Sequence, residues 1–106
     1  SQPEEALPVL ETSLALIRRH WSHDEEGILI AQTNLANCLG NVGRLDEALV
    51  LERETFARKA ALLGVSHEST ILTGYNVAVS LRQLNFLDEA KALIRDQLLP
   101  AARQSL

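Results

Sequence analysis

The chain repeats part of its own sequence at a displacement of 42 residues. The segment NLANCLGNVGRLDEA begins at Asn34, NVAVSLRQLNFLDEA begins at Asn76, and seven of the fifteen aligned positions are identical. Pro3–Leu7 aligns with Leu45–Leu49 in the same register. Repeats of about 20 to 50 residues are typical of solenoids, in which each unit buries its apolar face against the next. The sequence therefore predicts a stack of about two and a half similar units.

Each unit carries apolar residues at the three- and four-residue spacing of an amphipathic helix. The residues of this stripe in the first whole unit are Leu35, Ala36, Leu39 and Val42, then Leu45, Ala48 and Leu49. Small side chains at Ala36, Ala48, Ala78 and Ala90 should let paired helices approach closely. The pattern predicts an all-α fold of antiparallel helical hairpins, with no strand. Five helices are expected, at about 4–20, 25–41, 45–62, 68–83 and 87–103.

The predicted helices are separated by residues that favour turns. Gly43 and its counterpart Asn85 are the residue types that best tolerate a left-handed backbone at a helix C-terminus. Gly64 is expected to end a helix in a Schellman turn, and Ser66 to cap the helix that follows. Ser22–Glu25 has the spacing of a capping box. Gly43 and Asn85 therefore predict tight helical hairpins, and the turn between units, at Leu63–Ser66, is expected to be longer.

Gly74 lies in the middle of a predicted helix. Glycine there costs about 1 kcal/mol relative to alanine. We expect that this position lies close to a neighbouring helix or to a ligand.

Composition excludes several classes of function. The 106 residues, 46% of them hydrophobic, suffice for one domain. A net charge of −4, scattered basic residues and 4% aromatic residues argue against a nucleic-acid partner. No apolar run reaches the roughly 20 residues of a membrane span, and no signal peptide is indicated. The single cysteine, Cys38, forbids an internal disulfide and favours the cytoplasm.

No constellation of residues indicates catalysis or a cofactor. His20 and His23 precede three acidic residues and could share a metal ion, but no matching ligand cluster exists elsewhere, so no metal site is expected. Ser66 and Ser69 have no base and oxyanion pocket beside them. The glycines do not form a phosphate-binding loop. We therefore expect no enzyme activity.

The repeat resembles the tetratricopeptide repeat, and in particular its 42-residue form in kinesin light chains. The residues that carry the resemblance are N-L-A with Leu39, G-R-L-D-E-A-L at 43–49, and A-L-L-G-V-S-H-E-S-T at 61–70. Two positions depart from the family pattern. Glu68 replaces a frequent proline, and Glu52 replaces a frequent large apolar residue in the second helix. The resemblance covers nearly the whole chain.

The resemblance implies a right-handed superhelix that binds a partner peptide or helix in the groove formed by the first helices. It divides the chain into a half repeat at 1–22 and whole repeats at 23–64 and 65–106. The groove residues it implies are Thr33, Asn34, Asn37 and Asn41 in one repeat, and Tyr75, Asn76, Val79, Arg82 and Gln83 in the next. Only Arg82 is basic, which disfavours binding of a terminal carboxylate. The asparagines would bind a peptide backbone or, alternatively, only water or a neighbouring helix.

A second hypothesis is self-assembly. A solenoid usually has three or more repeats with polar caps. The first helix lacks the other half of its repeat, so it is expected to expose Val9, Leu10, Leu14 or Ile17. The chain would then be a fragment of a longer protein or would dimerise through its terminal helices.

Overall fold

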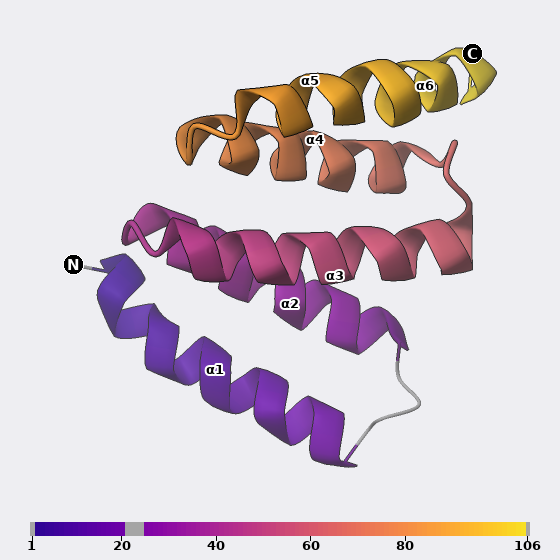
Figure 1. Cartoon of the computed structure of the whole chain (residues 1–106). Coiled ribbons are helices and arrows are strands. Elements are labelled where there is room, and N and C mark those ends of the chain that lie inside the picture. The colour runs from indigo at the N-terminus through magenta and orange to yellow at the C-terminus, as the bar shows by residue number, and fades with distance from the viewer. Residues whose placement is uncertain (1, 21–24, 106) are drawn as a thin grey trace.

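The computed structural model describes residues 2–20 and 25–105, and this part of the chain is a stack of helices without strands (Figure 1). The elements are α1 (Gln2–His20), α2 (Glu25–Asn41), α3 (Leu45–Leu63), α4 (Glu68–Gln83), α5 (Leu87–Leu93), the π-helical turn η1 (Ile94–Leu98) and α6 (Leu99–Ser105). The last three form one continuous helix, so the five predicted helices are confirmed. None of the helices in the described part is both long and apolar enough to span a membrane.

The helices stack in chain order, from α1 at one end to the α5–α6 helix at the other (Figure 1). Leu7 and Leu14 of α1 pack with Leu35 and Leu39 of α2 in one core cluster. Val77 and Leu81 of α4 form a second cluster with residues of α3 and α5. All four alanines expected at close helix contacts are buried. The core is therefore divided between successive helical pairs, as a repeat architecture requires.

Both hairpin turns end their first helix in the same way. Gly43 has φ +86° and Asn85 has φ +69°. Arg44 N donates to Leu39 O at 2.8 Å, and Phe86 N donates to Leu81 O at 2.8 Å. These bonds are the six-residue closures of a Schellman motif, which satisfy carbonyls that the helix leaves unpaired. The prediction of a left-handed residue at each turn is confirmed.

The turn between the two repeats differs from its prediction. Gly64 has φ 93° and ψ 155°, an extended conformation that glycine alone adopts readily, rather than the left-handed helical geometry of a Schellman turn. Ser66 does not cap α4; its Oγ donates to Gln104 Oε1 of α6 at 2.9 Å. The cap is His67, whose extended backbone places Nδ1 to accept from Ser69 N at 3.1 Å. Ser22, of the predicted capping box, lies outside the described residues.

Gly74 is a point of close helix contact, as predicted. A Cβ built there would touch Leu98 Cδ2, and it would lie 2.9 Å from Phe56 Cε1. Leu98 is the last residue of the π-helical turn, and Phe56 belongs to α3. The absence of a side chain at Gly74 therefore lets α4 fit between two neighbouring elements.

The prediction for the first helix is only partly right. Val9 is 64% exposed, but Leu14 is 4% exposed and Leu10 is half-buried. The expectation of a surface position was wrong for Leu14. Leu14 is buried because, like Leu7 two turns earlier, it lies on the face that packs against α2. Leu16, which was not predicted, is 47% exposed. The side chain of Ile17 lies outside the described residues.

Candidate functional site

One exposed stripe runs along α2 and is repeated along α4. Ile30, Asn34, Asn37 and Asn41 follow one another at intervals of four, three and four residues, which places them on one side of the helix. Their counterparts 42 residues later are Leu72, Asn76, Val79 and Gln83. All are exposed except Val79, which is half-buried. The two stripes thus begin with an apolar side chain and continue with mostly polar ones.

A cleft of about 240 Å³ lies between these helices, and we call it the amide cleft. Its lining residues come from α2, α3 and α4: Ala36, Asn37, Gly40, Asn41, Glu52, Asn76, Val79, Ser80 and Gln83. Five of the nine predicted groove residues are among them. The amide cleft is therefore the place where the predicted site residues of the two repeats meet.

The other four predicted residues line two further clefts. Thr33 and Asn34 line the apolar cleft, of about 710 Å³, whose walls include Ile30, Leu62 and Leu63. Tyr75 and Arg82, together with Val79, line a smaller cleft of about 150 Å³ against α5 and the π-helical turn. The nine predicted residues thus line three clefts, two of which share Val79.

The carboxamide side chains of the stripes have no hydrogen-bond partner in the part of the chain that the structure describes. Asn34, Asn37, Asn41, Asn76 and Gln83 make no side-chain hydrogen bond to any other described residue. The alternative named two partners for the asparagines, water and a neighbouring helix, and the described part of the chain shows no bond to a neighbouring helix. Thr33 differs, since its Oγ1 donates to Leu29 O at 2.8 Å. The carboxamides present both donors and acceptors to whatever occupies the clefts.

Glu52 is a site residue that sequence analysis did not select. It projects from α3 into the amide cleft, is half-buried, and accepts a hydrogen bond from Ser80 Oγ of α4 at 2.6 Å. Burial raises the pKa of the Glu52 carboxyl, and the bond from Ser80 opposes this only partly. Glu52 stands where the family pattern often has a large apolar residue, and this departure could have identified it as a site residue.

Replacing Glu52 with glutamine should stabilise the protein at neutral pH. The amide keeps an acceptor for Ser80 but removes a charge that folding desolvates, so we expect a gain of about 0.5 kcal/mol, or roughly 2–4 °C in Tm. Because the folded-state pKa lies above the ordinary value of 4.5, the penalty develops as pH rises through these two values and is absent below 4.5. Thermal unfolding at pH 7 and pH 3.5 measures it. A destabilised variant at pH 7 would show that the carboxylate itself stabilises the fold.

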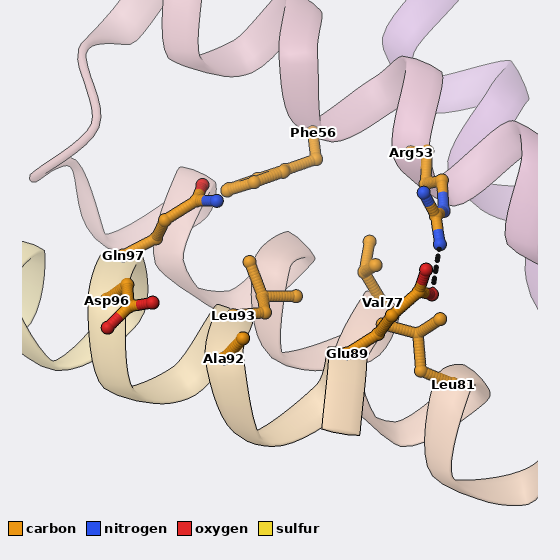
Figure 2. A pocket seen from close by; sticks show the side chains of 9 residues that line it. All are labelled: Arg53, Phe56, Val77, Leu81, Glu89, Ala92, Leu93, Asp96 and Gln97. Carbon is orange, nitrogen blue, oxygen red and sulfur yellow. Dashed lines mark hydrogen bonds and ion pairs between the residues drawn. The ribbon is translucent and has the colours of Figure 1, made fainter. Parts of the chain in front are cut away.

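A fourth cleft is lined by residues of α3, α4, α5 and the π-helical turn, and Figure 2 shows their side chains. Its volume is about 330 Å³, and its apolar lining includes Val77, Leu81 and Leu93. Arg53 of α3 pairs with Glu89 of α5 across one end at 3.0 Å, with both side chains more than half exposed (Figure 2). Exposed ion pairs of this kind contribute at most about 1 kcal/mol. We interpret this cleft as the seam between stacked repeats.

Metal ligands do not cluster in the part of the chain that the structure describes. No group of three or more His, Cys, Asp and Glu residues lies close enough there to hold an ion. His23 and the side chain of His20, which the sequence analysis weighed as ligands, lie outside the described residues. Cys38 is buried in the core cluster between α1, α2 and α3.

Comparison with known proteins agrees with this architecture. Residues 28–69 match a family model described as a tetratricopeptide repeat. The matched segment contains most of α2, all of α3 and the beginning of α4, and so spans one helical hairpin and the turn after it. No curated protein matches the chain. The match and the stacked helical hairpins together support an all-α tetratricopeptide-type helical repeat.

Proposed function

We propose that this tetratricopeptide-type repeat is a protein-interaction module that holds a peptide or helix of a partner protein against the stripes of α2 and α4, without catalysis of its own. Tetratricopeptide repeats generally mediate contacts between proteins. The observation that carries the proposal is the row of carboxamides whose hydrogen-bonding groups have no partner among the described residues. An extended peptide offers matching backbone donors and acceptors at regular intervals.

The proposal includes the finer features that the resemblance implies. The chain would comprise a half repeat at 1–22 and whole repeats at 23–64 and 65–106, in the kinesin-light-chain form and with a right-handed superhelical turn. A cytoplasmic location rests on the single cysteine, Cys38, which is typical of a reducing compartment.

Replacing Asn37 and Asn76 together with alanine should weaken peptide binding while leaving the fold intact. Each lost hydrogen bond is worth about 1 kcal/mol, so the pair should lower affinity by roughly 10- to 100-fold. Both side chains are exposed and make no bond within the described structure, so Tm should change by less than about 2 °C. Peptides selected from a random twelve-residue phage library on the unmodified protein supply the ligand, and fluorescence anisotropy measures the affinity.

Gln97→Ala is the matched control, because Gln97 is an exposed carboxamide that lines the fourth cleft and not the amide cleft. It should bind the selected peptides as the unmodified protein does. Failure of the folded protein to enrich any peptide, or an equal loss in the Gln97 variant, would contradict binding on the stripes of α2 and α4.

Self-assembly is a second candidate, favoured by exposed apolar side chains at both ends of the stack. Val9 and Leu16 are exposed on α1. At the other end, Leu87 of α5 is 45% exposed and Leu99 of α6 is 46% exposed. Sedimentation equilibrium over a wide concentration range separates the candidates, since a monomer at every concentration would exclude assembly through these side chains.

A further inference from the structure

We propose that the amide cleft receives an arginine side chain of the partner segment, with the Glu52 carboxylate as its counter-ion. This inference rests on the proposed function, because it specifies which side chain the peptide inserts between α2 and α4. The ligand class is a peptide that carries a guanidinium group.

The first argument is the position of Glu52 at the meeting point of three helices. It comes from α3, whereas the carboxamides around it come from α2 and α4. Its Oε2 accepts from Ser80, and no other hydrogen bond or ion pair joins Glu52 to a described residue. Two glutamates of the same helix are different, since Glu47 pairs with Arg44 and Glu54 pairs with Arg58. Glu52 is thus a half-buried acid for which the described chain supplies no cation.

The second argument is the chemistry of the cleft wall. The carboxamides of Asn37, Asn41, Asn76 and Gln83 all line it, and their oxygens are acceptors. No basic side chain lines the cleft, and the whole chain has a net charge of −4. A carboxylate beside several neutral acceptors suits a cation that has several donors. Charge complementarity therefore selects a basic side chain over an acidic or apolar one.

Arginine fits this arrangement better than lysine. Its planar guanidinium carries five donors, can bind a carboxylate with two parallel bonds and still reach neighbouring acceptors, and is more weakly hydrated than an ammonium group. Weak hydration matters because Glu52 is half-buried, so its partner must also lose water. A lysine would have to give up more of its hydration to reach the same carboxylate.

The adjoining apolar cleft provides a second anchor on the same stripe of α2. Ile30 lies in the apolar cleft and Asn37 in the amide cleft, seven residues apart on one helix. At about 1.5 Å per helical residue the separation is roughly 10 Å, which an extended peptide spans in about three residues. The preferred segment should therefore carry an apolar residue about three positions from the arginine.

Affinity for such a peptide should rise with pH until Glu52 is ionised. Burial raises the pKa of Glu52, and none of the other side chains that line the cleft from α2 and α4 is titratable. A guanidinium favours the ionised carboxylate. Peptide binding should therefore release a proton at pH values where Glu52 of the free protein is still protonated. The arginine remains charged throughout, which leaves Glu52 as the group that titrates.

The experiment selects peptides from a random twelve-residue phage library on the unmodified protein. It then compares their affinity for the unmodified protein with their affinity for the Glu52→Gln variant. Selected peptides should be enriched in arginine, and binding should fall at least tenfold in Glu52→Gln and by a similar factor when the arginine is replaced by citrulline. The two changes together should cost little more than either alone, and the pH dependence should disappear in Glu52→Gln. Glu89→Gln, which changes an exposed acid that lines the fourth cleft, should bind the peptides with unchanged affinity.

The outcomes separate this inference from the proposed function. Peptides enriched without a basic residue, or an arginine preference that persists in Glu52→Gln, would overturn the arginine site and leave peptide binding intact. Failure of the folded, unmodified protein to enrich any peptide would overturn both. Lysine in place of arginine with the same dependence on Glu52 would overturn the choice of guanidinium.

Discussion

Replacing Gly74 with valine is expected to lower the free energy of unfolding by about 3 kcal/mol, at the upper end of the usual cost of overpacking a core. A Cβ at this position would touch Leu98 Cδ2 and would lie 2.9 Å and 3.2 Å from Cε1 and Cζ of Phe56. Leu98 is 6% exposed, so its side chain has little room to move away. The helix propensity of valine exceeds that of glycine by only about 0.5 kcal/mol, which cannot offset the clash. Urea unfolding measures the loss.

Two comparisons isolate the cause of this loss. Gly40→Val makes the same change in α2, where a Cβ would meet nothing within 4 Å, and should be nearly neutral. In a Leu98→Ala background, Gly74→Val should cost at least 1 kcal/mol less, because one of the two clashing side chains is gone. An equal cost in both backgrounds would show that the contact with Leu98 does not limit this position.

Replacing Gln32 with methionine should instead stabilise the protein by about 1–2 kcal/mol. Gln32 is 0% exposed, and its Nε2 has no hydrogen-bond partner among the described residues. An unsatisfied buried amide costs about 1–3 kcal/mol, whereas methionine has a similar shape and helix propensity without that cost. Thr55, whose Oγ1 lies 3.2 Å from Gln32 Oε1, keeps a bond from its hydroxyl to Leu51 O at 2.8 Å.

Gln97→Met is the control for this substitution, because Gln97 is exposed and its stability should not change. Urea unfolding of both variants gives the comparison. A loss of more than about 1 kcal/mol in Gln32→Met would mean that the buried amide contributes bonds that methionine cannot replace.

The parts of the fold that follow from local sequence could be predicted. Helix limits agree with the expected ones within two residues, because the turns depend on Gly43 and Asn85, whose conformational preference is local. The polar members of the stripes of α2 and α4 were expected from the family resemblance, whereas their apolar first members, Ile30 and Leu72, were not selected, although helical periodicity places them on the same face.

Features that depend on three helices at once could not be predicted. Glu52 is half-buried because α2 and α4 both approach α3 at that point, and its own neighbours in sequence do not show this. The bond from Ser66 to Gln104 joins residues 38 apart, so the expectation of a local cap missed it. The π-helical turn at Ile94–Leu98 likewise has no distinct local signal in the repeat pattern.

The two hairpins share a backbone plan, yet they are not interchangeable. The displacement of 42 residues makes Gln32 the counterpart of Gly74, and Thr55 the counterpart of Gln97. One hairpin accommodates a buried carboxamide beside Thr55, whereas the other requires an empty position beneath Leu98. Gly74 also lies against Phe56 of the preceding hairpin, so a permuted protein with the hairpins in reverse order would separate Gly74 from the ring that packs beside it. The side chains of each hairpin therefore fit one position in the stack, so the order of the hairpins is determined even though their turns are alike.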